Sequence, residues 1–518
     1  MQNALDTALS KSISGSSAVR LADLALAAGC LEQADSLALN GAQAPNHAAF
    51  IARRFWYDGA MTAAVEHLKL EEAKHGGSRS AKRLASQRRR LESELKVFTG
   101  FLPVLTPREH QPRKRTVMHV LTNSLPHTGS GYAQRTHSIL TAQRDLGWNV
   151  SAVTRLGYPV QVGKVLASGA DSVDGIDYVR INPGRLKEGM AARLQQQAEL
   201  VADEAVRRGA SVLHTTTHFT NALVTAAAAD ALGIPWVYEV RGQLADTWAS
   251  TRGPEAIRSE RFRLFREREA DVMKRADLVV TLGEAMRANI VDAGVDSANI
   301  LVAPNAVGGA FLDEPMTQQD ARRQLGLAED ALMIGTVSSL VDYEGLDTLL
   351  RAAALLIPRF SKLRVLIVGD GVSAPSLRAL AQELGISAQT IFTGRVPRNL
   401  TPIYHAALDV FVVPRIDSSV TRDVTPLKPV EAMASARPVV ASDLPALREL
   451  LAEGETGMFA QAENPASLAS SIDPLLVSPQ KRYQLGRRAR QVTLLDRTWK
   501  ANAKRALSAY DRLTKNGG

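Results

Sequence analysis

From residue 116 onward, short apolar segments alternate with Ala- and Leu-rich segments of helical spacing. The apolar segments include VMHVLT, WNVSAVT and SVLHTTTH, and a second series begins near residue 331 with ALMIGTVSS and RVLIVGDG. Parallel strands joined by crossover helices are the economical explanation of such alternation. The pattern therefore predicts an α/β fold with two successive doubly wound domains, over residues 116–312 and 313–495.

Two facing domains of this kind predict a cleft for a ligand. In doubly wound sheets, ligands bind beyond the carboxyl ends of the strands. The segment AVGGAFLDEP, with its glycine pair and proline, predicts the hinge between the domains. The last 23 residues, 496–518, predict a C-terminal helix after the second domain.

Residues 1–115 have a different character and predict a helical extension with a linker. LADLALAAGCLEQADSLAL and FIARRFWYDGAMTAAVEHL look alike, with Gly29 and Gly59 thirty residues apart. Each resembles a helical hairpin of the tetratricopeptide kind, although two such units are fewer than a solenoid needs. TPREHQPRKR, which contains two prolines, predicts the linker to the main domain.

The positive charge is concentrated in residues 79–115. This segment holds eleven Lys/Arg against three acidic residues, which is +8 of the chain's total of +9. A nucleic-acid enzyme would spread such charge around its working cleft, so the pattern argues against nucleic acid as a partner. Leu84, Leu91, Leu95 and Phe98 lie at helical spacing beside the basic face. Two interpretations remain open: a solvated helix that leans on its own domain, or a peripheral contact with an anionic membrane. Self-association through the N-terminal helices is a further possibility.

Composition narrows the cellular setting. The 518 residues include one cysteine, Cys30, which excludes an internal disulfide framework and fits a reducing cytosol. The start of the chain lacks the pattern of a signal peptide, and no apolar stretch approaches about 18 residues. The expectation is a cytoplasmic protein, peripheral at the inner face of the plasma membrane if the basic segment binds lipid.

Two segments carry the residue types of an anion-binding site. In SLPHTGSGYAQR, Gly129 and Gly131 would let the backbone approach a ligand at a helix start, although an ordinary turn explains Gly-x-Gly as well. The more specific segment is PRIDSSVTRDVTPLKPVEAM, where Arg415, Arg422 and Lys428 precede a helix that carries Glu431. Cations beside a helix start suit a diphosphate, and a carboxylate there suits the hydroxyls of a ribose.

Residues 116–512 resemble retaining glycosyltransferases of family 4. Besides the two segments above, the resemblance rests on LGIPWVYEVRG, ADLVVTLGEAMRANI, ILVAPNAV, IFTGRVPRNLTPIYHAALDVFVVP and LKPVEAMASARPVVASD. That family has the GT-B architecture, in which two Rossmann-like domains face a cleft. The resemblance implies an N-terminal acceptor domain, a C-terminal nucleotide-sugar domain, and a last helix that crosses back to the first domain. It does not cover the N-terminal hundred residues.

The resemblance also implies roles for individual residues of the nucleotide-sugar domain. The family's Glu-x7-Glu motif matches Asp423-x7-Glu431, so Glu431 would hold the ribose and Asp423 would face the donor sugar. The cations that the family often places near the first strand of this domain are here Ser339 and Glu344. Arg422 and Lys428 are then the candidates that neutralise the phosphates, and Gly394, Arg395 and Val396 would lie against the base.

The N-terminal domain contributes further candidates. His218 flanks the position where many relatives carry a histidine that contacts the donor sugar, although a lone histidine at a strand end more often has a structural role. His127, Arg135 and Arg241 are candidates for contact with the acceptor or the leaving phosphate. Tyr132 and Trp248 could stack on a sugar or simply pack.

The predicted reaction is transfer of a sugar from a nucleotide-diphosphate donor to a hydroxyl, with a UDP-sugar as the favoured donor and a GDP-sugar as the alternative. The acceptor would be a glycan, a lipid-linked molecule or a component of the cell envelope. The resemblance implies retention of anomeric configuration without a metal or other cofactor. Two alternatives stay open: a nucleotide-sugar epimerase on the same fold, and a binding protein whose site has decayed, which Ser339 and Glu344 motivate.

Overall fold

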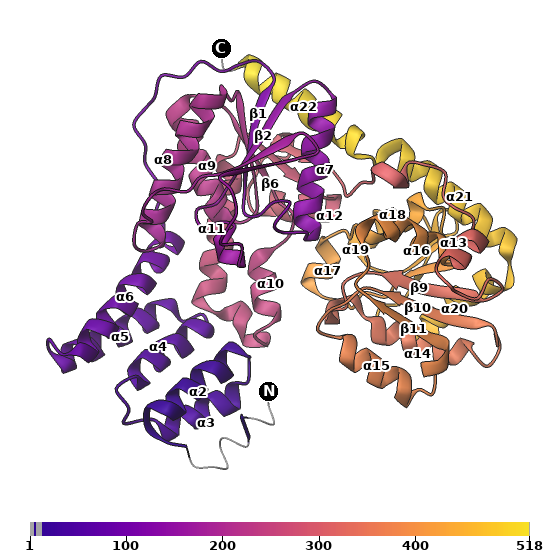
Figure 1. The fold of residues 1–518 in the computed structure, drawn as a ribbon, viewed down its shortest axis with the longest axis horizontal. Coiled ribbons are helices and arrows are strands. Elements are labelled where there is room, and N and C mark those ends of the chain that lie inside the picture. The colour runs from indigo at the N-terminus through magenta and orange to yellow at the C-terminus, as the bar shows by residue number, and fades with distance from the viewer. Residues whose placement is uncertain (1–4, 7–12, 517–518) are drawn as a thin grey trace.

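The computed structural model describes residues 5–6 and 13–516, in which a helical region precedes two α/β domains (Figure 1). The helical region consists of hairpins, as its repeated sequence predicts. Its helices are α2 (Gly15–Ala27), α3 (Leu31–Asn40), α4 (His47–Tyr57), α5 (Met61–His75) and α6 (Arg79–Phe98). Gly29 and Gly59 lie in the turns of the hairpins α2–α3 and α4–α5, where both have the positive φ that glycine adopts readily.

Helix α6 joins the helical region to the rest of the molecule through its apolar face. Leu84, Leu91 and Phe98 are each only 2% exposed. The Phe98 ring lies edge-on to the rings of Phe219 and Phe265, at 5.2 and 5.7 Å between centroids. The structure therefore supports the solvated helix that leans on its own protein. The apolar positions proposed for lipid contact are not available to a membrane, although basic side chains of α6 remain exposed.

The first α/β domain is built on an eight-stranded sheet in the order β3-β4-β2-β1-β5-β6-β7-β8, parallel except for the pair β3–β4. Its strands are β1 (Thr116–Leu121), β2 (Asn149–Thr154), β3 (Ala170–Val173), β4 (Ile176–Arg180), β5 (Val212–Thr216), β6 (Trp236–Glu239), β7 (Leu278–Thr281) and β8 (Ile300–Val302). Its helices are α7 (Gly131–Asp145), α8 (Met190–Arg208), α9 (Phe219–Leu232), α10 (Leu244–Ser250), α11 (Glu260–Arg275) and α12 (Glu284–Asp292). Strands β1, β5, β6 and β7 are wholly buried, because helices cover both faces of a parallel sheet.

The second domain has a six-stranded, all-parallel sheet in the order β11-β10-β9-β12-β13-β14. Its strands are β9 (Leu332–Val337), β10 (Leu363–Val368), β11 (Thr390–Gly394), β12 (Val410–Val413), β13 (Val439–Ser442) and β14 (Gly457–Ala460). Its helices are α13 (Gln318–Gln324), α14 (Leu346–Leu356), α15 (Ala374–Glu383), α16 (Thr401–Ala407), α17 (Ser419–Asp423), α18 (Lys428–Ala434), α19 (Pro445–Arg448), α20 (Pro465–Val477) and α21 (Pro479–Asp496). The predicted architecture, two doubly wound domains with a helical N-terminal extension, is confirmed.

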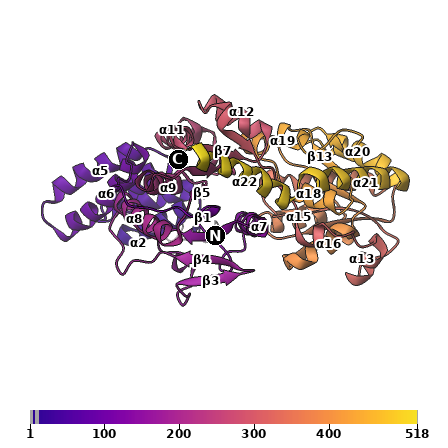
Figure 2. The same ribbon diagram turned by 90° about the horizontal axis from the view of Figure 1, so that it is seen from above.

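The chain passes between the two domains twice, and the two crossings lie side by side. After α21 it returns to the first domain as α22 (Trp499–Asn516), which packs against α7 (Figures 1 and 2). Where the crossings meet, the Val307 N–H donates to the Arg497 carbonyl at 2.9 Å, and the Trp499 N–H donates to the Val307 carbonyl at 3.1 Å. The outgoing crossing contains the segment predicted as the hinge. No helix of the described residues is long and apolar enough to cross a membrane.

Candidate active site between the domains

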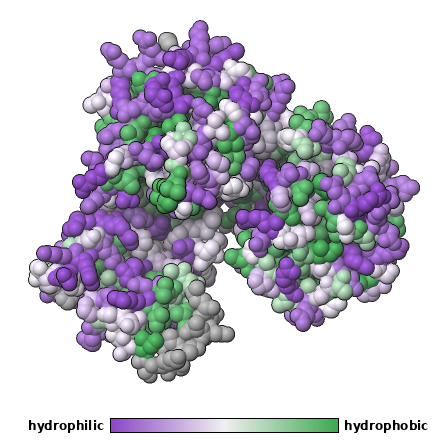
Figure 3. Space-filling view, viewed as in Figure 1, coloured by the Kyte–Doolittle hydropathy of each residue, from purple (hydrophilic) through white to green (hydrophobic). Residues whose placement is uncertain are grey.

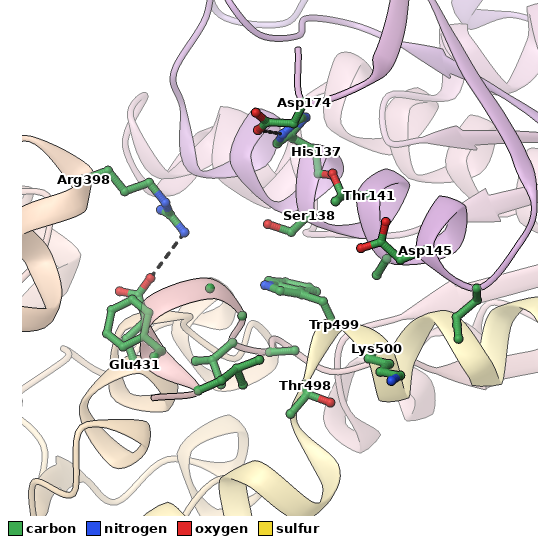
Figure 4. A pocket seen from close by; sticks show the side chains of 18 residues that line it. His137, Ser138, Thr141, Asp145, Asp174, Arg398, Glu431, Thr498, Trp499 and Lys500 are labelled. Atoms are coloured by element: carbon green, nitrogen blue, oxygen red, sulfur yellow. Dashed lines mark hydrogen bonds and ion pairs between the residues drawn. The ribbon is translucent and has the colours of Figure 1, made fainter. Parts of the chain in front are cut away.

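A cavity of about 630 Å³ opens between the two α/β domains (Figure 4). Figure 3 shows the molecule hollowed between these domains on the same face as Figure 1. One wall is helix α7, with Ser138, Thr141 and Asp145, and the opposite wall carries Glu431 and Arg398 of the second domain. The start of α22 and the outgoing crossing close the remaining side. The cavity thus brings the Glu431 motif opposite the first helix of the other domain.

Glu431 lies on α18, one turn from the helix start, and is only 2% exposed. Its carboxylate is 3.1 Å from Lys428 Nζ and 3.7 Å from Arg398 Nη2. Burial alone would raise the pKa of Glu431, but Lys428 first, then His405 and Arg398, hold it at about 2. The group is therefore a carboxylate at any physiological pH, and it can accept hydrogen bonds from a pair of hydroxyls.

His405 lies next to the Glu431 carboxylate on the side away from the cavity. The sequence alone did not assign this histidine a role. It lies on α16, is fully buried between the rings of Phe311 and Phe411, and has Nε2 3.7 Å from the Glu431 carboxylate. Burial lowers the pKa of His405 and the neighbouring carboxylate raises it in part. The only sequence signal was its position in TPIYHAALDVFVVP, where a single histidine has no distinguishing pattern.

Asp423, the first acid of the motif, lies at the end of α17 against the first domain. Its carboxylate accepts a hydrogen bond of 2.7 Å from Gln243 Nε2, directly before α10. Burial raises the pKa of Asp423, the Asn289 side chain lowers it, and nearby Asp246 raises it further. The two acids of the motif therefore differ: Glu431 lines the large cavity, whereas Asp423 meets a side chain from the opposite domain.

The two cations proposed for the phosphates have different surroundings. Lys428 is half-buried and contacts Glu431. Arg422 is exposed and makes a two-point ion pair with Asp417, at 2.5 and 2.7 Å, so it is held away from the cavity lining. Arg398, which sequence reasoning did not single out, lines the cavity beside Glu431 instead.

The two residues that depart from the family pattern, Ser339 and Glu344, have different surroundings. Ser339 is exposed after β9, whereas Glu344 accepts from Arg415 Nη2 at 2.7 Å and from Nε at 3.2 Å. Gly394 ends β11 with φ of 71°, followed by exposed Arg395 and half-buried Val396. These three residues lie on the strand end that precedes Arg398.

Gly129 and Gly131 precede and begin α7, and both are exposed. A Cβ atom placed on either glycine would meet no protein atom within 4 Å. Their surroundings are therefore open enough for a ligand to approach the backbone at the start of this 15-residue helix.

Two of the predicted N-terminal candidates, Arg135 and Arg241, have buried protein partners for their guanidinium groups. Arg135 is 4% exposed, donates to Glu239 at 2.8 Å and to the Ala303 carbonyl at 2.9 Å, and stacks on the Trp499 ring. Arg241, 3% exposed, donates to the same Glu239 and to Thr136, both at 2.6 Å. A buried guanidinium needs acceptors, and the buried carboxylate at the end of β6 supplies them.

The histidine candidates also have protein partners. His218 caps α9, where its Nδ1 accepts from the Thr220 N–H at 3.3 Å, and its ring packs on Phe219 and Phe265. Burial, with Arg261 and Arg155, lowers the pKa of His218 to about 4, so it is neutral near pH 7. His127 lies 3.1 Å from the Asp171 carboxylate. The structural interpretation of His218 is the one that these contacts support.

A smaller cavity of about 150 Å³ lies on the first domain beside the same cleft. Its lining includes Asn123, Ser130, Tyr132, Thr216 and Arg241. Hydroxyl and amide groups of this kind suit a polyhydroxylated acceptor. Among the described residues, no group of three or more His, Cys, Asp or Glu side chains could hold a metal ion.

Both α/β domains match family models of sugar-transferring enzymes. Residues 130–306 match the glycosyl transferase 4-like domain, and residues 317–492 match glycosyl transferases group 1. The two α/β domains belong to these glycosyltransferase families. Together the two models cover the α7 wall of the cavity and the opposite wall with Arg398 and Glu431, and they also include Gly131 and Asp423.

Curated relatives agree with this assignment. A D-inositol 3-phosphate glycosyltransferase of Corynebacterium urealyticum is 33% identical over 258 residues, which are 47% of this chain and 59% of that protein. A GDP-mannose-dependent alpha-(1-6)-phosphatidylinositol monomannoside mannosyltransferase of Mycolicibacterium smegmatis is 28% identical over 44% of this chain and 61% of its own. The chain thus spans about three fifths of the length of these relatives.

Solved structures share the fold of this glycosyltransferase. Sucrose-phosphate synthase from Thermosynechococcus elongatus is 20% identical with a TM-score of 0.63, over 78% of this chain and all of that one. HepE of Anabaena, in complex with UDP and glucose, is 17% identical with a TM-score of 0.60, over 77% of this chain and all of that one. At these identities the likeness concerns the fold alone.

Proposed function

We propose that this glycosyltransferase moves a sugar from a UDP-sugar or GDP-sugar to a hydroxyl of a glycan or lipid-linked acceptor, with retention and without a metal. The observation that carries the proposal is the Glu431 carboxylate, buried between Lys428 and Arg398 in the wall of the interdomain cavity. A permanently ionised acceptor beside two cations matches a ribose joined to a diphosphate.

In the proposed reaction the second domain holds the nucleotide and the first domain presents the acceptor. The bond between the anomeric carbon and the diphosphate oxygen breaks, and the acceptor oxygen bonds to the same carbon on the same face. The acceptor proton passes to the departing diphosphate. Lys428 and Arg398, together with the exposed start of α7, would stabilise the negative charge that develops there, most effectively where water is excluded.

The relatives guide the choice of substrates. By their names, one acts on inositol 3-phosphate and the other uses GDP-mannose on a phosphatidylinositol mannoside. They support a hydroxyl on a phosphorylated or lipid-linked acceptor of the cell envelope. We place the reaction on the cytoplasmic side of the membrane, where nucleotide sugars are available, with exposed basic residues of α6 toward anionic lipid.

One observation supports the alternative of a binding protein with a decayed site: Ser339 and Glu344 stand where the family often has cations. Calorimetry with UDP, GDP, UDP-glucose and GDP-mannose distinguishes the two functions. Binding of a nucleotide, followed by transfer to a lipid extract when the matching sugar donor is supplied, is the expected result. Absence of nucleotide binding would leave the decayed binding protein. Conversion of the nucleotide sugar to its epimer without an acceptor would establish the epimerase.

A further inference from the structure

A second large cavity lies outside the cleft, where the N-terminal helices meet α10 and α11. Its volume is about 610 Å³, similar to that of the interdomain cavity. It is lined by Trp56 and Tyr57 of α4, Glu94 of α6, Trp248 of α10, and Arg252 and Arg261. The family models begin at residue 130, so most of the lining, which also includes Asp23, Leu26, Ala27 and Arg53, comes from a part of the chain that they do not describe.

The N-terminal helical region and the first α/β domain, which together form this cavity, are joined by hydrogen bonds. The Arg261 N–H donates to the Gly59 carbonyl at 3.0 Å, and the Thr62 N–H donates to the Glu260 carboxylate at 2.8 Å. A Cβ atom on Gly59 would lie 2.9 Å from the Trp248 ring and 2.6 Å from Ser259 Oγ. Glycine at this turn therefore allows the close approach that shapes the cavity.

Aromatic rings hold two arginines at the cavity wall. The Arg252 guanidinium lies over the rings of Tyr57 and Trp248, 4.9 and 4.8 Å from their centroids. Arg261 lies over Trp248 at 5.4 Å. Stacking on aromatic faces orients a guanidinium and leaves its N–H edge free for a carboxylate or phosphate.

These two arginines each have a buried N–H donor without an acceptor. Arg261 reaches only Glu94, at 3.4 Å, and Arg252 Nη1 donates to the Trp248 carbonyl and Thr251. The Nε atoms of both arginines are buried without a hydrogen-bond partner among the described residues. Burial lowers the pKa of Arg261, and Arg252 lowers it further against the effect of Glu94. In contrast, Arg53 at the same cavity is satisfied by a two-point pair with Asp23 at 2.7 Å.

Helix α10 connects this cavity to the cleft. Gln243, just before the helix, donates to Asp423, and Leu244 lines the 150 Å³ cavity with Thr216 and Arg241. Trp248 follows Leu244 by one turn, about 6 Å along the helix axis. Figure 1 shows α10 between the N-terminal helices and α17 of the second domain. A sugar chain whose end lies in the cleft would thus reach the second cavity within a few units.

We propose that this cavity binds an anionic sugar of the acceptor, distant from the hydroxyl that receives the new sugar. The carboxylate or phosphate of that sugar accepts from Arg252 and Arg261, and its ring lies against Trp56. This inference rests on the proposed function, because the saccharide that binds here is the acceptor. It assigns the N-terminal helical region a part in acceptor selection.

Calorimetry on the full chain tests the proposal with three saccharides: trigalacturonate, neutral galactotriose and galactose 6-phosphate. We expect trigalacturonate or galactose 6-phosphate to bind at least tenfold more tightly than galactotriose, and the better of the two identifies the anionic group as carboxylate or phosphate. Arg252→Gln should weaken that binding at least tenfold. The matched control is Arg258→Gln, because Arg258 is 77% exposed and carries the same charge nearby; it should leave binding unchanged.

Three results would overturn the proposal: no binding of either anionic sugar, equal binding of galactotriose, or unchanged affinity in Arg252→Gln. UDP and GDP are titrated into the same preparations. If the unmodified chain binds neither UDP nor GDP, the proposed function is rejected. If it binds a nucleotide but no anionic saccharide, only the proposed saccharide site in the second cavity is rejected. Arg252→Gln should retain full nucleotide affinity, which also shows that the variant is folded.

Discussion

Glu344 and Arg415 form a two-point ion pair in which Arg415 Nη2 and Nε donate at 2.7 and 3.2 Å. The resemblance to family 4 implies a cation at position 344, where this chain has an acid. The structure supplies a cation to the same place from the end of β12, 71 positions later. Local charge is thereby neutralised, and the cation that Glu344 holds is committed to a protein partner. Lys428 and Arg398 are then the cations beside Glu431.

Breaking this pair should destabilise the second domain. Both side chains are largely buried, at 8% and 15% exposed, so removal of either partner leaves a poorly solvated charge. We expect Arg415→Gln and Glu344→Gln each to lower the free energy of unfolding by about 1–3 kcal/mol. Urea unfolding of the double variant should show a loss smaller than the sum of the two. Additive losses would mean that the contact contributes nothing specific.

Glu431→Gln should weaken nucleotide binding while the fold is retained. It removes the negative charge that Lys428 and Arg398 hold at the cavity wall, at a cost of about 1.5–3 kcal/mol, or roughly 10- to 100-fold in Kd. Calorimetry with UDP and GDP measures the change. Glu383→Gln is the matched control because Glu383 is exposed at the end of α15. Equal affinities in both variants would remove Glu431 from the nucleotide site.

His218 should make the protein less stable in mild acid. Its folded-state pKa of about 4 lies below the ordinary value of 6.5, so the unfolded chain binds its proton first as the pH falls. The stabilising contribution is complete above pH 6.5 and is lost as the pH falls toward 4, by about 1–3 kcal/mol. His218→Asn keeps a helix cap without a titrating group. A stability–pH profile from 7 to 4 that is as steep in this variant as in the unmodified chain would contradict the assignment.

Chelation should not affect the reaction. The charge on the leaving diphosphate is assigned to Lys428, Arg398 and the start of α7. We therefore expect the same transfer rate with and without EDTA once a donor and acceptor are known. A rate that EDTA abolishes and magnesium or manganese restores would contradict the metal-independent mechanism.

Any membrane contact of α6 should be purely electrostatic, because its apolar face is buried in the protein. Arg89 and Arg90 are exposed on this helix. Their reversal to Glu should abolish co-sedimentation of the full chain with anionic vesicles at low salt. Reversal of Lys504 and Lys515, which are exposed on α22, is the matched control. Binding should also weaken as salt rises, since the Debye length is about 8 Å at physiological ionic strength. Equal sedimentation with neutral vesicles would exclude a charge-driven contact.

The elements of this fold could be predicted from the sequence because each depends on a local pattern. Buried strands such as β12 are continuous apolar runs, and the hairpins around Gly29 and Gly59 repeat with one period. Lys428 and Glu431 could be placed together because they lie three residues apart on one helix. Their proximity follows from helix geometry and needs no tertiary information.

Side chains whose partners are distant in the sequence could not be predicted in the same way. Arg135 and Arg241 look like free cations until the sheet brings Glu239 between them. Arg415 reads as a surface charge unless Glu344 is known to face it. His405 gains its significance only because α16 packs beneath α18. In each case the long-range fold, not the local pattern, determines which polar groups remain available to a ligand.

The paired crossings at Val307 and Thr498 limit how the two halves of the enzyme can move. With a single connecting segment, the two domains could both twist and bend relative to each other. Two connecting segments joined by a β-bridge with two hydrogen bonds restrict the relative motion of the domains mainly to rotation about one axis. Each closure of the cleft would therefore return Glu431 to the same position opposite α7. The alignment of the two walls would then be set by the chain itself and would not depend on the substrate.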